Sequence, residues 1–337
     1  MVGQDQVKVA VIGVGYLGRF HAEKLKRLKN AELVAVVDSD LMRARSLAAD
    51  LGVRAFDDHR QVLELVQAVT VVTPTVSHHQ VAMDFLEAGK DVLCEKPITA
   101  TLEQADALVA LAAQKGCILQ VGHLERFNPA VEELVRRVRR PLFIEVNRIA
   151  PFKARATDVD VALDLMIHDL DIILALVGED PKEIRAVGVP VIGEHADIVN
   201  SRLEFPGGCV ANVTASRLAL KDERKMRVFQ PDAYLSLDFK KRRLTVVGKV
   251  EFRPGRLPKV DAERPRFPKS DPLESELKDF LEAVKTRRRP RVDGADGRRA
   301  LACALAVRER VCQGLGDMEQ YLAVSRRLVG ALPPGEE

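Results

Sequence analysis

Two groups of side chains in this chain have the types and spacing that acid–base chemistry requires. Lys96 stands in the tripeptide Glu95-Lys96-Pro97, and Asp164 stands four residues before His168. A lysine at the end of a strand can stabilise an oxygen that becomes negative during a reaction. A histidine titrates near neutral pH and can take the proton of a hydroxyl. Because residues four apart share one face of a helix, Asp164 can bind substrate or hold the imidazolium.

Each group also has an ordinary structural explanation. Most lysines are simply exposed, and an aspartate and a histidine at this spacing can form an ion pair on a helix surface. Spacing alone favours that ion pair for Asp164 and His168. Whether these residues do chemistry therefore depends on the elements that position them.

The first such element is a glycine-rich turn between a strand and a helix. The strand Val7–Ile12 runs into Gly13-Val14-Gly15-Tyr16-Leu17-Gly18, and a second strand, Glu32–Val37, is followed by Asp38. The glycines permit a sharp turn, a close approach of the backbone to a pyrophosphate, and tight packing of the helix on the strand. The helix start offers free N–H groups to phosphates, and the acid can bind the ribose hydroxyls. This order predicts cofactor contacts at Gly13, Gly15, Tyr16, Leu17, Gly18 and Asp38.

The segment Asp38-Ser39-Asp40 bears on which dinucleotide is bound. It places two acids where the 2′-phosphate of NADP would lie, and no arginine follows directly. Because like charges repel, we expect NAD rather than NADP.

The hydrophobic pattern predicts two different domains. Residues 1–123 alternate strands with helices, and the continuous apolar run Ala68–Thr73 is typical of a buried parallel strand. Beyond them, Val199 to Phe205 alternates apolar and polar residues, as an antiparallel strand with one wet face does. We therefore expect an α/β protein: an N-terminal Rossmann domain with a parallel sheet, and a C-terminal α+β domain, residues 124–337, with a largely antiparallel open sheet. The segment Arg253–Pro272 is predicted to be a long surface loop.

Three turns at the carboxyl ends of the predicted parallel strands carry polar residues, and ligands bind at that edge of such sheets. They are Thr73-Pro74-Thr75, followed by His78; Glu95-Lys96-Pro97; and the stretch from Gly122 to Pro129.

Composition excludes several other classes of protein. The net charge of +3 is too small to indicate nucleic-acid binding, and the five cysteines lack any CxxC spacing. No cysteine–histidine arrangement predicts a metal site, and the longest apolar stretches are too short to span a bilayer. Without a recognisable signal peptide, we expect a cytoplasmic protein that binds neither nucleic acid nor a membrane.

These motifs together resemble those of the Gfo/Idh/MocA oxidoreductases over nearly the full chain. The match lies in Gly13–Gly18, Thr73-Pro74 with His78, Glu95-Lys96-Pro97, and Asp164-x-x-x-His168-x-x-Asp171. The resemblance implies hydride transfer between a sugar-like alcohol and a nicotinamide, in a homodimer or homotetramer. It implies that Lys96 contacts substrate and nicotinamide, that His168 is the acid/base and that Asp164 assists it. It also adds Thr73, Pro74, His78 and Glu95 to the cofactor contacts.

The stretch Val121–Ala130 is similar to a subgroup that acts on the 3-hydroxyl of UDP-N-acetylglucosamine, a step toward the 3-amino sugars of lipid A. That similarity assigns His123 to the substrate and Arg126 to the cofactor. Lys153 and Arg155 can face a diphosphate, although their position in a loop by itself favours solvated charges. A free-sugar or inositol dehydrogenase, or a non-catalytic regulator that binds a dinucleotide, remains an alternative.

Overall fold

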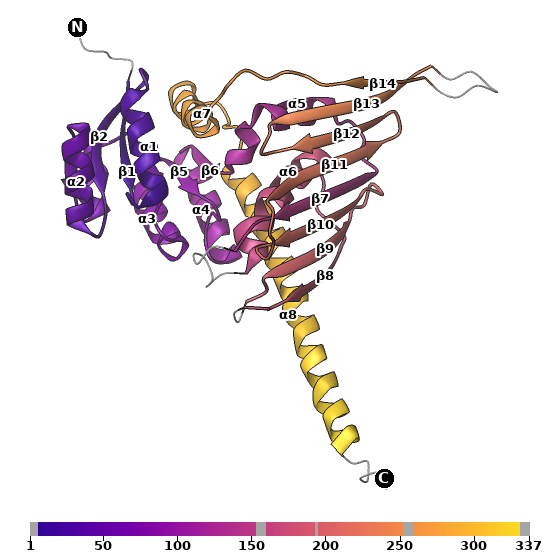
Figure 1. Cartoon of the computed structure of the whole chain (residues 1–337). Helices are drawn as coiled ribbons and strands as arrows, with labels where there is room; N and C mark the ends of the chain where they lie inside the picture. Colours follow the sequence, from indigo (N-terminus) through magenta and orange to yellow (C-terminus); the bar gives the residue numbers. More distant parts are fainter. Residues whose placement is uncertain (1–5, 153–159, 193–194, 252–258, 331–337) are drawn as a thin grey trace. The chain divides into compact units, whose positions relative to one another are not determined.

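The computed structural model describes residues 6–152, 160–192, 195–251 and 259–330 (Figure 1). The chain forms two compact units. Unit 1 comprises Met1–Glu133 with Arg266–Ala302, and unit 2 comprises Leu134–Pro265 with Cys303–Glu337. Helices α5 (Pro129–Arg137) and α8 (Gly294–Gly330) each contribute residues to both units. The division into a cofactor domain ending at residue 123 and a substrate domain stays a prediction, because these units are defined by packing alone.

Unit 1 is built on a six-stranded parallel sheet with the strand order β3-β2-β1-β4-β5-β6. The order reverses between β1 and β4, which is where such sheets bind ligands. This confirms the predicted doubly wound sheet. Its strands are β1 (Val7–Ile12), β2 (Ala31–Val37), β3 (Arg54–Phe56), β4 (Ala68–Val71), β5 (Asp91–Glu95) and β6 (Leu119–Gly122). Its helices are α1 (Tyr16–Arg27), α2 (Leu41–Leu51), α3 (Thr75–Glu87), α4 (Leu102–Lys115) and α7 (Pro272–Thr286), with 3₁₀ turns η1 (His59–Leu65) and η2 (Leu124–Phe127).

Helix α7 joins this unit from far along the sequence. Its buried face, which includes Leu277, Phe280 and Leu281, belongs to the same apolar core as Val9 and Leu25. Asp271 caps the helix by accepting a hydrogen bond from the N–H of Glu274. The return of the chain thus buries one side of the parallel sheet and brings acidic residues of α7 beneath it.

Unit 2 is built on an eight-stranded sheet with the order β14-β13-β12-β11-β7-β10-β9-β8. Neighbouring strands are antiparallel except β7 and β10, which are parallel, so the largely antiparallel sheet is confirmed. The strands are β7 (Phe143–Ile149), β8 (Glu183–Val189), β9 (Ile198–Glu204), β10 (Val210–Ser216), β11 (Glu223–Gln230), β12 (Ala233–Asp238), β13 (Arg243–Glu251) and β14 (Lys259–Glu263). The π-helical turn η3 (Ala162–Met166) and helix α6 (Ile167–Val177) follow β7 along the chain.

Two predicted boundaries are wrong. Residues 259–263, placed in a long loop by the surrounding prolines, form the edge strand β14 and pair with β13. An edge strand needs main-chain hydrogen bonds on one side only, and none of those five residues is a proline. The sequence pattern also predicts a helix over Gly294–Gln313, but helix α8 continues beyond Gln313 to Gly330, through Gly314 and Gly316. None of the helices among the described residues is both long enough and apolar enough to cross a membrane.

Candidate active site

The glycine-rich turn between β1 and α1 has the geometry that the sequence predicted. Gly13 has φ +85°, and a Cβ there would lie 2.7 Å from the carbonyl oxygen of Val72. A Cβ on Gly18 would lie 1.9 Å from the carbonyl oxygen of Gly13, so this glycine packs the helix against the turn itself. A Cβ on Gly15 would meet no described atom within 4 Å, which leaves its backbone open to a ligand. Each of the three positions thus requires glycine for a different physical reason.

A cleft of about 440 Å³ lies in front of this turn. Its volume is within the usual range for small-molecule sites. Tyr16 and Leu17, in the first turn of α1, are exposed, and α1 begins with no acidic residue that would oppose a phosphate. An open glycine backbone, a helix start and a cleft fit the pyrophosphate of a dinucleotide. The cleft is lined by the ends of β1 and β2, by the turn that follows β4, and by residues of α2, η1 and α3, among them Gly13, Gly15, Asp38, Thr73, Pro74 and Ser77.

Asp38, at the end of β2, is buried and already holds three donors. Its carboxylate accepts hydrogen bonds from the N–H of Val14 at 2.9 Å and of Asp40 at 3.0 Å. The guanidinium of Arg43, on the first turn of α2, also lies 3.1 and 3.3 Å from its two oxygens. Sequence reasoning considered only the residues that follow Asp38 directly and missed Arg43. A basic residue in the first turn of the helix after the acid was the available signal.

His78, on α3, is buried and joins two of the strand-end turns. Its ring nitrogens lie 2.8 Å from the carbonyl oxygen of Thr73 and 2.9 Å from that of Pro97. Both partners are acceptors, so the ring satisfies both only when both nitrogens carry a proton. The structure therefore gives His78 contacts with the backbone of the turns that hold Thr73 and Lys96.

Glu95, the last residue of β5, points into the protein. Its carboxylate accepts the N–H of Lys96 at 3.2 Å, and the Nε2 of His21 lies 3.2 Å from its other oxygen. On the neighbouring strand, Gly122 is paired with Glu95, and a Cβ there would lie 2.8 Å from the carboxyl group. Glu95 thus occupies the space that any larger residue at position 122 would take. Lys96 begins the turn that follows, and the peptide bond between Lys96 and Pro97 is cis.

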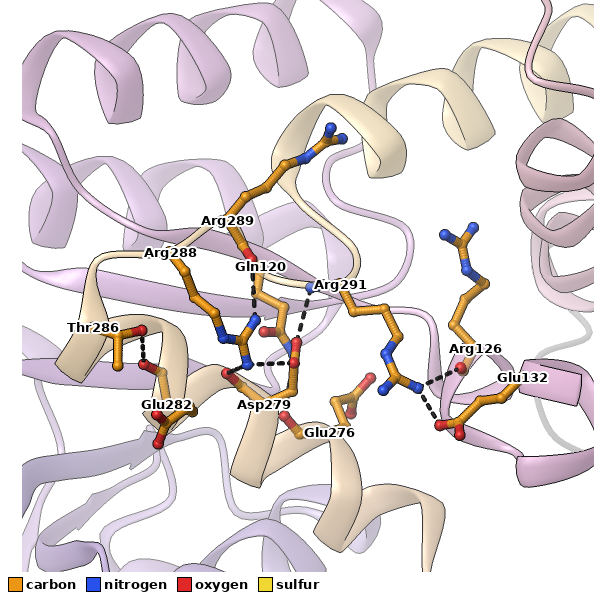
Figure 2. A network of polar contacts seen from close by, with 10 residues as sticks. All are labelled: Gln120, Arg126, Glu132, Glu276, Asp279, Glu282, Thr286, Arg288, Arg289 and Arg291. Atoms are coloured by element: carbon orange, nitrogen blue, oxygen red, sulfur yellow. Dashed lines mark hydrogen bonds and ion pairs between the residues drawn. The ribbon is translucent and has the colours of Figure 1, made fainter. Parts of the chain in front are cut away.

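The stretch after β6 places His123 and Arg126 in unit 1. His123 is buried at the start of η2, which contains Arg126. Figure 2 shows how a residue between α7 and α8 contacts this turn: Arg291 donates to the carbonyl oxygen of Arg126 at 3.2 Å and pairs with Glu132. The guanidinium of Arg291 also lies 4.8 Å from the centre of the Phe127 ring. Arg291 therefore holds η2 in place through the contacts with Arg126, Glu132 and Phe127, a role that the sequence did not indicate.

In unit 2, Asp164 and His168 lie in two different kinds of helix. Asp164 belongs to the π-helical turn η3, and His168 to the first turn of α6; both are half-buried. Asp160 starts η3 by accepting hydrogen bonds from the N–H groups of Ala162 and Leu163. π-Turns are rare and are frequent at functional sites. The spacing of Asp164 and His168 predicts a regular α-helix here, whereas Asp164 lies in the wider π-helical turn.

A buried ion pair fixes the helix that carries His168. Asp169 accepts two hydrogen bonds from Arg148 of β7, at 2.6 and 2.8 Å. Asp169 is fully buried, and Arg148 lies against the Phe239 ring. The sequence carried a signal that was missed, because Arg148 occupies an inward position of the alternating strand β7. Lys153 and Arg155, predicted to contact the substrate, lie outside the described residues.

Comparison with known families supports both halves of the fold. Residues 7–123 match the family described as "Oxidoreductase family, NAD-binding Rossmann fold", and residues 144–236 match the GFO/IDH/MocA C-terminal domain. The first match covers the glycine-rich turn, Asp38 and Lys96, and the second covers Asp164 and His168.

Individual relatives agree with these matches. The chain is 41% identical to the UDP-N-acetylglucosamine 3-dehydrogenase of Acidithiobacillus ferrooxidans, over 90% of this chain and 97% of the relative. A solved structure of that enzyme superposes with a TM-score of 0.86, covering 91% of this chain and 97% of the other. The chain is also 29% identical to the myo-inositol 2-dehydrogenase of Thermotoga maritima, over 90% of this chain and 96% of the relative.

Proposed function

The chain belongs to the Gfo/Idh/MocA family of oxidoreductases, and on this premise we propose that it is an NAD-dependent dehydrogenase. The proposed reaction oxidises the 3-hydroxyl of UDP-N-acetylglucosamine to a ketone. The observation that carries this proposal is the 41% identity to a UDP-N-acetylglucosamine 3-dehydrogenase over nine-tenths of the chain. The motif residues Lys96, Asp164 and His168 are all present, as a catalyst requires and a non-catalytic regulator does not.

The proposed chemistry divides among three side chains. His168 takes the proton of the hydroxyl, and Lys96 donates to the same oxygen and stabilises its developing negative charge. Asp164 holds the imidazolium or the substrate. A bound nicotinamide supplies the hydride acceptor. Lys96 belongs to unit 1, and Asp164 and His168 belong to unit 2.

The cofactor contacts are proposed at the turn and the cleft. Gly13, Gly15, Tyr16, Leu17 and Gly18 contact the pyrophosphate, Thr73 and Pro74 line the nicotinamide half, and Asp38 binds the ribose. Glu95, His78 and Arg126 stay in the proposed cofactor set. The buried positions of His78 and Glu95 support the view that they act by holding the turns around Thr73 and Lys96. His123, Lys153 and Arg155 stay proposed substrate contacts.

NAD is the proposed cofactor, although Arg43 lies near the proposed ribose site. Arg43 is paired with Asp38 and with Asp40, which lies 3.3 Å away. A 2′-phosphate would have to displace both acids from the arginine, whereas a ribose hydroxyl can share the Asp38 carboxylate. Binding of NAD and NADP measured side by side tests this point, and tighter binding of NADP would contradict it.

Three further features are proposed for the biological setting. We propose a cytoplasmic homodimer or homotetramer, whose product, a 3-keto sugar, is aminated toward lipid A. Apolar side chains exposed on the sheet of unit 2 support self-association, and include Val187, Val189, Ile198 and Phe229. Light scattering in solution measures the oligomeric state.

The second candidate is a dehydrogenase acting on inositol or a free sugar. The myo-inositol 2-dehydrogenase of Thermotoga maritima and the scyllo-inositol 2-dehydrogenase of Bacillus subtilis favour it, the latter 32% identical over 64% of this chain and 68% of the relative. The same catalytic residues serve both reactions, so only substrate preference separates the candidates.

A substrate panel followed at the absorbance of NADH tests the proposal. It contains UDP-N-acetylglucosamine, N-acetylglucosamine, UDP-glucose, glucose and myo-inositol, each with NAD and with NADP. We expect turnover with UDP-N-acetylglucosamine and NAD. Preference for inositol or a free sugar supports the second candidate, and NAD binding without any turnover supports a regulator.

Matched variants test the catalytic residues. Lys96→Ala and His168→Ala should each lower kcat by roughly 10²- to 10⁴-fold, the usual contribution of positioned acid–base groups. Lys90→Ala and His79→Ala change the same residue types outside the proposed machinery and should leave kcat unchanged. Full activity in either catalytic variant would refute its assignment.

A further inference from the structure

A buried cluster of three titratable side chains lies beneath the turn that carries Lys96. It consists of His21 on α1, Glu95 at the end of β5, and Glu276 on α7, all within unit 1. One ligand atom from each lies within 4.8 Å of the other two. His21 and Glu276 have no solvent exposure, and Glu95 is 9% exposed. Two carboxyl groups and an imidazole thus share a small, dry space.

The partners of this cluster are few. Among the described residues, neither ring nitrogen of His21 and neither carboxyl oxygen of Glu276 has a hydrogen-bond partner. The contact of 3.2 Å between His21 and Glu95 is therefore close without being aligned as a hydrogen bond. The backbone carbonyl of Glu276 accepts from the side chain of Gln120 at 3.2 Å. Gly122 closes the cluster from β6, because its missing side chain makes room for the Glu95 carboxyl group.

The basic side chains near α7 form ion pairs with acids other than Glu276. Lys24 of α1 pairs with Asp271, and Arg291 pairs with Glu132 beside η2, which also carries Glu125 and Arg126. On α7 itself, Asp279 accepts from Arg288 at 2.7 Å. In Figure 2 no dashed line joins Arg288 or Arg291 to the Glu276 carboxyl group: Arg288 contacts Asp279, and Arg291 contacts Glu132. Among the described residues, no lysine or arginine donates a hydrogen bond to the Glu276 carboxyl group.

Electrostatics then limits how many charges the cluster can hold. Two carboxylates this close in a dry environment do not both ionise, so one keeps its proton. Burial raises the pKa of Glu276 well above its usual range, and the charges of Glu95 and Asp279 raise it further. Glu95 receives the N–H of Lys96, a donor that favours a carboxylate at that position. The proton therefore belongs on Glu276.

We propose that Glu276 is a positioning residue that stays a neutral carboxylic acid at neutral pH, so that a single negative charge, on Glu95, lies beneath Lys96. If both groups were charged, repulsion would push the Glu95 carboxylate off Gly122 and displace the backbone N–H of Lys96 that it holds. Glu276 thus acts on Lys96 through Glu95 and touches neither substrate nor cofactor. The catalytic consequence rests on the proposed role of Lys96; the protonation state does not.

A divalent cation is the other occupant that three such ligands could hold. A structural metal site is usually completed by four protein ligands, and these residues supply three. The experiment separates the two cases, because a metal requires both glutamates to be ionised and a shared proton does not.

Infrared difference spectra in D₂O measure the protonation directly and need no turnover. We expect wild-type protein at pD 7 to show the C=O stretch of a protonated carboxyl group, and Glu276→Gln to lose it. Glu282→Gln, an exposed site on the same helix, should retain it. Absence of the band in wild type overturns the proposal. So would a metal ion bound at one equivalent and lost together with activity on chelation.

Kinetics test the positioning role with two substitutions at one site. Glu276→Gln keeps the shape and hydrogen-bond donor of the neutral acid, and its kcat should stay within about threefold of wild type. Glu276→Ala should lower kcat by about tenfold or more while the KM for the sugar changes less. Wild type should lose kcat at alkaline pH, as Glu276 ionises, to a greater extent than Glu276→Gln. Equal kcat for the alanine and glutamine variants overturns the role. If wild type turns over none of the panel, the proposed function fails, while the infrared result still decides the protonation.

Discussion

Two of the three proposed catalytic residues, Lys96 and His168, are each next in the chain to a buried acid, and the two units stabilise that acid differently. In unit 1, Glu95 precedes Lys96 and lies beside His21 and Glu276. In unit 2, Asp169 follows His168 and is bound by both arms of Arg148, at 2.6 and 2.8 Å. The charge of Asp169 is thus neutralised by the permanent cation of Arg148. The charge of Glu95 has no second carboxylate beside it, because Glu276 keeps its proton.

The difference teaches what each arrangement allows. A guanidinium keeps its charge at any physiological pH, so the link between Arg148 and Asp169 does not change with pH. A carboxylic acid can lose its proton, so the cluster of unit 1 carries a built-in dependence on pH. His168, the proposed acid–base residue, is therefore next in the chain to an acid whose ion pair does not depend on pH, whereas Lys96 follows an acid whose surroundings can titrate.

The largest expected effect comes from breaking the permanent pair. Arg148→Leu leaves Asp169 buried without its cation and should lower the free energy of unfolding by about 3–5 kcal/mol. Replacing both partners, as Arg148→Leu with Asp169→Leu, should recover much of that loss, because no unpaired charge remains. Urea unfolding followed by circular dichroism measures both, since the chain has no tryptophan. Equal losses in the single and double variants would show that packing, not charge, fixes α6.

The next effect comes from filling the space that Glu95 occupies. Gly122→Ala places a methyl group 2.8 Å from the Glu95 carboxyl group and should destabilise the protein by about 1–3 kcal/mol. The variant should also weaken catalysis, because the turn with Lys96 must shift. Gly314→Ala is the control: its Cβ meets no described atom within 4 Å, and alanine favours the helix. A stable Gly122→Ala protein would show that Glu95 is free to move.

A third effect should appear only as a dependence on pH. Glu276 in the unfolded chain releases its proton near its ordinary pKa of about 4.3, whereas its raised pKa in the folded chain keeps the proton. Between the two values the folded state binds more protons, so stability falls as pH rises. Glu276→Gln removes this loss, and its stability relative to wild type should rise by up to about 1.4 kcal/mol per pH unit in that window.

Thermal unfolding at pH 5 and pH 8 measures this difference. The stability of Glu276→Gln relative to wild type should be higher at pH 8 than at pH 5. The stability of Glu282→Gln relative to wild type should be the same at both pH values. A constant offset for Glu276→Gln would contradict a neutral buried acid and would make the two units alike.

The smallest effect is expected at an exposed ion pair of unit 1. Arg298 donates to Asp106 at 2.8 and 3.2 Å, the same bidentate geometry as in the buried pair but on the surface. Asp106→Asn should change stability far less than Arg148→Leu does, and less still at high salt. A loss as large as that of Arg148→Leu would mean that burial does not set the difference between these pairs.

The local sequence was sufficient for much of the first unit. The glycine-rich turn, the strand ends at Asp38 and Glu95, and the parallel order follow from short-range rules about glycine, apolar runs and crossover helices. The second unit was harder, because β14 is an edge strand among prolines and the π-turn at Asp164 breaks the expected helix. Neither feature has a strong local signal.

The sequence by itself determined the family motifs, the class of cofactor and the residue types able to move a proton. Only the tertiary structure decided which buried groups surround the acids next to those residues. Arg148 and Asp169 are 21 residues apart, and Glu276 lies 181 residues beyond Glu95. Such partners meet only when a sheet and its helices pack, because burial and long-range charge depend on the whole fold rather than on neighbours along the chain.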